Sequence, residues 1–149
     1  MAQLLRETLT KIVDTLLGVL EKEPDDRSYT GVVPTAAGLV KFRLDPDGET
    51  FETALSDARS LVENLESYLQ RAKARLVMDL LAEKNELLAQ NGGGVLTEAE
   101  FRRRVTVQVI EIYGGGAATF VFSDDDLFGG RLLVVSIDSD GIAQQAQLA

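Results

Sequence analysis

The feature that most constrains the fold is a stretch of about forty residues, from Thr50 to Gln90, that contains neither Pro nor Gly. Its apolar residues recur every three or four positions, the spacing of one face of an α-helix. A single helix of this length would span about 60 Å, more than the diameter of a compact domain of this size. We therefore expect a break near residues 68–72, but no Pro or Gly marks it, so one helix and two helices both stay open. The apolar face comprises Leu55, Ala58, Val62, Leu65, Leu69, Ala72 and Leu76.

Short β-type segments flank this helical region. Residues 29–33 and 39–44 are rich in β-branched and aromatic side chains, and the turn at 34–38 predicts a hairpin between them. Short turns of Gly and Asp punctuate the last third of the chain, and such turns favour antiparallel neighbours. We therefore predict an α+β fold with an antiparallel sheet, made of the N-terminal hairpin and a C-terminal four-strand meander and packed by the long or kinked central helical segment. The four meander strands are expected at 105–113, 117–123, 131–138 and 141–148.

The first 23 residues predict an amphipathic helix that ends before Pro24. It is expected to pack on its own domain, or to serve as a peripheral docking helix. The whole chain, 1–149, is expected to be one domain with its α+β body at 29–148. The apolar stripe of the helix includes Leu5, Leu9, Ile12, Leu16 and Leu20.

Two local patterns predict details of the C-terminal half. Thr97 followed by Glu100 is a capping box, which predicts the start of a short helix. In the next segment the apolar alternation through Val107 and Val109 changes phase at Ile110. That change predicts a bulge, or a strand buried on both faces.

The composition excludes several kinds of chemistry and partner. The chain has no Cys, His or Trp, so it cannot form a disulfide, use a thiolate nucleophile or relay protons through imidazole. We expect no cofactor. A net charge of -9 repels nucleic acid phosphates and anionic lipid, so neither nucleic acid nor membrane is an expected partner. Charged residues interrupt the apolar residues of the N-terminus, which is unlike a signal peptide, and we expect a cytoplasmic protein.

The most distinctive run is 124–131, with three successive Asp residues, Leu127, Phe128 and two Gly residues before Arg131. Asp is favoured in turns because its side chain bonds to nearby backbone amides, so a solvated turn is the expected structure. Two of the carboxylates, those of Asp124 and Asp126, are the candidates if Mg²⁺ or Mn²⁺ binds. No catalytic residue is identified, because no nucleophile motif accompanies them.

The order of the motifs resembles a family of uncharacterised bacterial domains. The segments that carry the resemblance are "GLVKFRLDPDGE", "LLAEKNELL", "LTEAEFRRRVTVQVIEIY" and "FVFSDDDLFGGRLLVVSID", and together they cover about residues 29–148. That family carries an Asp-x-Leu-Phe-Trp-Gly-His signature, which here reads Asp-Asp-Leu-Phe-Gly-Gly-Arg. Gly129 stands where the family has Trp, and Arg131 stands where it has His. Because the family's function is unknown, the resemblance implies a fold and no activity.

Three hypotheses about function follow. The first is a non-catalytic, acidic protein-binding domain, in its concrete form an immunity-type protein that neutralises a basic partner. The second is a self-associating module, a homodimer that pairs the stripe of the N-terminal helix. The third is a metal-dependent enzyme built on the carboxylates of 124–126. The residues expected to contact a protein partner, on one edge of the meander, are Asp124, Asp125, Asp126, Phe128, Asp138 and Asp140.

Overall fold

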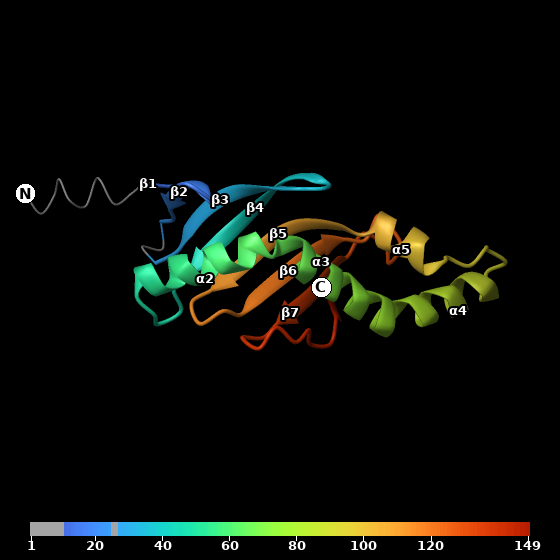
Figure 1. The fold of residues 1–149 in the computed structure, drawn as a ribbon. Helices are drawn as coiled ribbons and strands as arrows, with labels where there is room; N and C mark the ends of the chain where they lie inside the picture. Colours follow the sequence, from blue (N-terminus) through green and yellow to red (C-terminus); the bar gives the residue numbers. More distant parts are fainter. Residues whose placement is uncertain (1–10, 25–26) are drawn as a thin grey trace, which may run out of the picture.

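The computed structural model describes residues 11–24 and 27–149 (Figure 1). Within these residues, eight strands form one sheet in which every strand lies beside its neighbours in the sequence. All neighbouring pairs are antiparallel except β4 and β5, which are parallel. The strands are β1 (Lys11–Asp14), β2 (Gly18–Lys22), β3 (Tyr29–Thr35), β4 (Gly38–Asp45), β5 (Thr106–Tyr113), β6 (Ala118–Ser123), β7 (Leu132–Ile137) and β8 (Gln147–Leu148).

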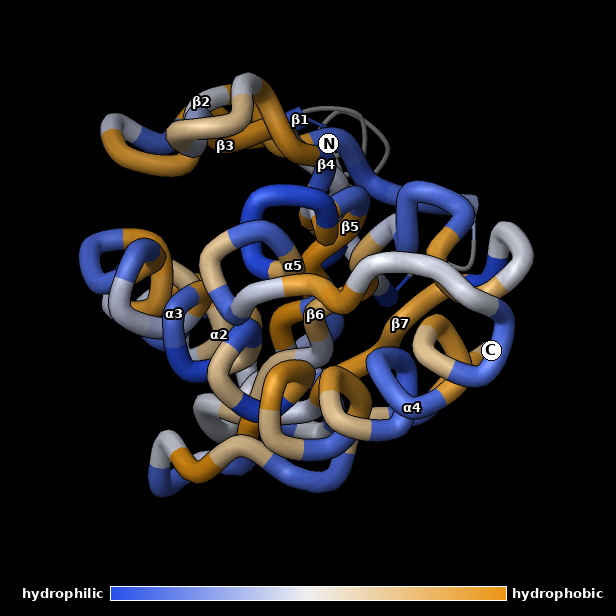
Figure 2. The backbone as a smooth tube through the Cα atoms, turned by 90° about the vertical axis from the view of Figure 1, so that its right-hand side faces the viewer, coloured by the Kyte–Doolittle hydropathy of each residue, from blue (hydrophilic) through white to orange (hydrophobic). Residues whose placement is uncertain are grey.

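The helices form the crossover that parallel neighbours require, because the chain must return to the same end of the sheet between β4 and β5. They are α2 (Phe51–Glu63), α3 (Leu65–Leu76), the π-helical turn η1 (Val77–Leu81), α4 (Ala82–Gln90) and α5 (Glu98–Arg104). The buried residues of the strands and helices form one apolar core, and the strands β5, β6 and β7 are mainly hydrophobic (Figure 2). The largest fully buried side chains include Phe42, Phe101, Phe120 and Phe122.

The predicted arrangement of strands is wrong. The sheet is a single mixed sheet and not an antiparallel hairpin accompanied by a separate four-strand meander. Lys41 of β4 pairs with Val109 of β5, so two segments far apart in sequence form the centre of the sheet. Short turns predict which neighbours pair locally, but they carry no information about this distant parallel contact. The last expected strand is also reduced to Gln147–Leu148.

The predicted N-terminal helix is wrong for residues 11–22, which form the hairpin β1–β2. Asp14 is buried, and its Oδ1 accepts hydrogen bonds from the amides of Leu16 and Leu17, both at 2.9 Å. Arg59 of α2 donates Nε to Asp14 Oδ2 at 2.7 Å, and this bond lowers the pKa of Asp14 below its ordinary value. Gly18 has a φ of 76° and begins β2. The buried positions of this hairpin, Asp14, Leu17 and Leu20, lie three residues apart, a spacing that also fits one face of a helix. Residues 1–10 lie outside the described residues.

The central helical region breaks at Asn64 and not at 68–72. Asn64 has a φ of -113°, and its side-chain amide donates to the Ser60 carbonyl at 2.9 Å. Asn commonly competes in this way with the backbone ladder of a helix. The helical path resumes at Leu65 and changes to π-helical geometry over Val77–Leu81.

Two local predictions are confirmed. Thr97 Oγ1 accepts from the Glu100 amide at 3.1 Å while the Glu100 carboxylate accepts from the Thr97 amide at 3.4 Å, which completes the capping box. The pairing of β5 with β6 shifts register between Val107 and Val109, which is the expected bulge.

The glycine turn between β5 and β6 packs tightly against the turn that leads from β4 into α2. The Gly114 amide donates to the Asp45 carbonyl at 2.8 Å, and the Gly115 amide donates to the Asp57 carboxylate at 2.9 Å. A Cβ atom at Gly114 would overlap the carbonyl oxygen of Pro46. This turn therefore ties the end of the parallel pair to the first helix.

We expect Gly114→Ala to lower the free energy of unfolding by about 2–3 kcal/mol, because the added methyl group overpacks a backbone contact. Urea denaturation measures this change. Gly94→Ala is the matched control, since nothing lies within 4 Å of a Cβ atom at that position. Equal denaturation midpoints for the two variants would contradict the assignment of this contact.

Candidate functional site

Three segments that carry the sequence resemblance meet at one end of the molecule: α4, α5 and the loop 124–131 between β6 and β7 (Figure 1). Asp124 organises the loop. Its carboxylate is buried, with the residue 3% exposed. It accepts four backbone hydrogen bonds, from Asp126 at 2.9 Å, Phe128 at 2.9 Å, Gly130 at 3.1 Å and Arg131 at 3.0 Å.

These bonds determine the charge state of Asp124. Burial alone would raise the pKa of its carboxyl group, but the hydrogen bonds outweigh burial, and its pKa lies below the ordinary value. The ionised carboxylate thus stabilises the backbone of the loop. The described part of the chain contains no cluster of three Asp, Glu, His or Cys side chains that could hold one.

The loop is joined to both neighbouring helices. Asp125 and Asp126 have left-handed backbone φ values of 48° and 60°. The Asp125 carboxylate binds Arg104 of α5, with Nε to Oδ2 at 2.8 Å. Phe128 packs partly into the core, and the Lys84 ammonium group of α4 lies 5.5 Å from the centre of its ring. The loop is therefore held in place at the root of both helices.

Residues 82–97, comprising α4 and the loop that follows it, extend from this root, and we call them the arm. Asn85 ties α4 to the loop that follows it, because its side chain donates to the Leu96 carbonyl at 2.9 Å and accepts from the Leu96 amide at 2.7 Å. No residue of α4 is buried. Leu87 is 46% exposed and Val95 is 62% exposed. The arm is thus an ordered projection that leaves apolar side chains in solvent.

The structure separates the predicted partner-binding residues into two groups. The loop with Asp124 follows β6, whereas Asp138 and Asp140 follow β7, which runs the opposite way. The two turns therefore lie about 17 Å apart, at opposite ends of the strands. Like Asp124, Asp138 organises its own turn, since its carboxylate accepts from the amides of Asp140 and Ile142, both at 3.0 Å.

The stripe predicted for self-association does not form a helical surface in the described residues. Ile12 and Leu20 pair across β1 and β2, Leu20 is fully buried, and Leu16 lies in the turn with 39% exposure. Leu5 and Leu9 lie outside the described residues.

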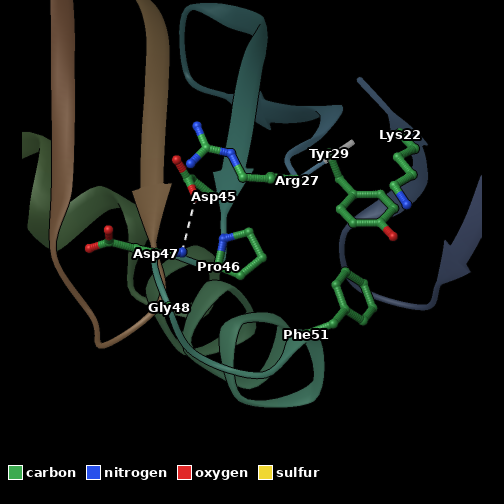
Figure 3. Close-up of a pocket in the computed structure, with 8 residues that line it drawn as sticks. All are labelled: Lys22, Arg27, Tyr29, Asp45, Pro46, Asp47, Gly48 and Phe51. Carbon is green, nitrogen blue, oxygen red and sulfur yellow. Dashed lines mark hydrogen bonds between the residues drawn. The ribbon is translucent and has the colours of Figure 1, made fainter. Parts of the chain in front are cut away.

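A hollow of about 390 Å³ lies between β3, α2 and the turn at 45–48 (Figure 3). Tyr29 and Phe51 form its apolar side, with ring centres 4.7 Å apart. Asp45 on the other side already accepts the Asp47 amide at 2.9 Å, and Arg43 lies 3.9 Å from its carboxylate. Charges of both signs line this hollow, and its carboxylate is engaged internally, so it is a weaker candidate than the arm.

Sequence reasoning missed Asn85 and Arg104. One signal for Asn85 was present, because Asn is a poor residue for a helix interior and often marks a side chain that bonds to the backbone. Arg104 is the last of three successive arginines, and nothing in the sequence distinguishes it from Arg102 and Arg103. Its contact with Asp125 depends on the packing of α5 against the loop, which no local pattern predicts.

The fold and site define an α+β domain in which an eight-stranded mixed sheet supports a projecting helical arm. The chain belongs to the family described as an uncharacterized protein conserved in bacteria (DUF2262), whose model matches residues 14–148. The predicted resemblance to an uncharacterised bacterial family is thereby confirmed, while the signature motif stays a prediction. No curated protein and no solved structure matches the chain. No helix in the described ranges has both the length and the apolar character needed to cross a membrane.

We expect Asp124→Asn to lower the free energy of unfolding by about 2–3 kcal/mol at neutral pH, because the amide cannot replace both acceptor oxygens. A carboxyl group with a depressed pKa stabilises the fold above its unfolded pKa of about 4, and this contribution disappears as pH falls through the folded value. The difference between wild type and variant should therefore shrink below about pH 4. Urea denaturation at several pH values measures it. Asp126→Asn is the matched control, and a pH-independent difference for Asp124→Asn would contradict this role.

We expect Asn85→Ala to release the loop at Leu96 from α4 without unfolding the sheet. Loss of both bonds to Leu96 should speed amide hydrogen exchange at Leu96, while exchange in β5 and β6 stays slow. Hydrogen exchange read by NMR measures both. Gln90→Ala, an exposed change on the same helix, is the control. Unchanged exchange at Leu96 in Asn85→Ala would show that other contacts hold the arm.

Proposed function

We propose that this chain is a non-catalytic protein-binding domain that acts in the cytoplasm and binds a basic protein, as an immunity-type protein would. The observation that carries the proposal is the arm. An ordered helix with no buried residue contributes little to its own domain, and exposed apolar side chains on such a projection are typical of a surface that another protein covers.

Exposed carboxylates on the arm and on the adjoining loop favour a basic partner, while Lys84 of the same helix lies over the Phe128 ring. Glu83 and Glu86 are exposed on α4, next to the exposed Leu87, and Asp126 is exposed on the adjoining loop. An apolar anchor with charged residues at its rim is the usual anatomy of a protein interface. The net charge of -9 would also speed the encounter with a cationic protein. Asp126, Phe128 and the arm thus replace the wider set of carboxylates as the proposed contacts.

The engagement of Asp124 and Asp138 within their own turns also favours binding over catalysis. A general acid or base needs a carboxyl group that can exchange its proton with a substrate. Asp124 instead spends its oxygens on four backbone amides. We therefore place the function of the loop in presenting its exposed residues in one fixed geometry.

The test is capture from a lysate of the native host by the tagged full chain, with quantitative mass spectrometry. We expect one basic protein to be retained by the wild type, to be released as salt increases, and to be lost with Leu87→Lys and with Glu86→Lys. Replacing an apolar anchor, or reversing a charge beside it, should weaken binding about tenfold or more.

Glu63→Lys is the matched control, because this variant reverses the same charge at an exposed carboxylate, at the end of α2. The captured protein should be retained by this variant. Capture of an acidic protein, or equal loss with Glu63→Lys and Glu86→Lys, would overturn the assignment of the arm.

A further inference from the structure

The sheet face that points away from the helices carries an unbroken line of side chains, one from each strand. The pairing registers place them beside one another across the sheet, with Val19 and Val32 aligned by extension of the β2–β3 register. We call this line the valine row. It comprises Val13, Val19, Val32, Lys41, Val109, Val121, Val134 and Gln147.

The valine row is exposed where a one-sided sheet normally carries polar residues. Val13 is 80% exposed, Val19 53% and Val32 51%, and the other three valines are partly exposed. On one flank the next row along the strands is polar throughout, whereas the opposite flank includes the exposed residues Leu39 and Leu132. That polar row comprises Lys11, Glu21, Thr30, Arg43, Glu111, Thr119 and Ser136.

The face also has a shallow depression over the first half of the sheet. A depression of about 320 Å³ lies over β2, β3 and β4, and its lining includes Val19, Val32 and Lys41. Lys41 makes no ion pair within the described residues. Its aliphatic stem can therefore cover a neighbouring valine while the ammonium group stays in solvent.

The area of this face matches what a stable dimer buries. Eight strands about 4.8 Å apart and about 20 Å long cover roughly 750 Å², against about 800 Å² per partner in a standard interface. Two twisted sheets pack face to face about 10 Å apart, with their inner side chains interdigitated. A standard interface would therefore use most of this face, with the valine row at its centre and the polar row at its margin.

The row is also complementary to itself. A two-fold axis that crosses the row between β4 and β5 would place Val19 and Val32 against Val134 and Val121 of a second copy. It would place Lys41 against Val109, with the Lys41 of the second copy one strand away across the axis, so both ammonium groups would turn along the strands toward the polar row. We propose that the outer face of the sheet binds a second copy of this chain, which forms a dimer of two face-to-face sheets through the valine row.

The test is sedimentation velocity of the full chain over a range from micromolar to millimolar concentration. We expect a reversible dimer, whose dissociation constant rises about tenfold or more with Val32→Lys. The double variant Val19→Thr/Val32→Thr keeps the β-branched shape and should also weaken the dimer. Circular dichroism and the urea midpoint of each variant show that the sheet is intact.

Two controls separate this surface from others. Ile142→Lys adds the same charge at a residue that is 60% exposed and lies in the turn after β7, so the dimer should persist. Leu87→Lys should abolish partner capture by the arm and leave the dimer unchanged, so the two proposals can fail independently. A wild type that stays monomeric at millimolar concentration overturns the proposal. A dimer that Val32→Lys leaves unchanged also overturns it, because the contact then lies at an edge strand or the arm.

Discussion

The parallel pairing of β4 with β5 is the contact on which the rest of the structure depends. It joins two sets of locally paired strands into one sheet and requires the crossover that contains every helix after residue 50. That crossover includes the arm, whose helix α4 has no buried residue. The projecting surface is thus part of the connection that the parallel pair requires.

The acidic turns show how formal charge differs from available charge. Asp14, Asp124 and Asp138 each accept backbone amides in a tight turn, and Asp125 is paired with Arg104. These carboxylates fix backbone geometry and offer little to a ligand. The charge left for recognition lies on exposed residues such as Glu83, Glu86 and Asp126.

Local features of the sequence predicted local structure well. Strands formed at the first predicted hairpin, and the capping box at Thr97 and the bulge before Val109 lie where the pattern placed them. The sheet was mispredicted because parallel pairing depends on a contact between residues such as Lys41 and Val109. The N-terminal helix was mispredicted because burial at every third residue, Asp14, Leu17 and Leu20, also occurs in this hairpin, whose turn contains Gly18. The site was only partly foreseen, since the link between Arg104 and Asp125 arises from packing.

The edge of the sheet beside β7, where the short strand β8 lies, has a consequence for aggregation. An exposed, regular edge strand can template the addition of further strands from other molecules. Here β8 pairs with Leu133 and Val134, and Ala149 extends this short ladder to Leu132. The chain before β8 follows β7 irregularly, with the Gln144 amide donating to the Ser136 carbonyl at 2.7 Å. The Ala146 amide turns away to the Asp79 carboxylate of η1 at 2.7 Å. The side of the sheet at β7 is thus covered by a segment too irregular to extend, which disfavours fibre growth from that edge.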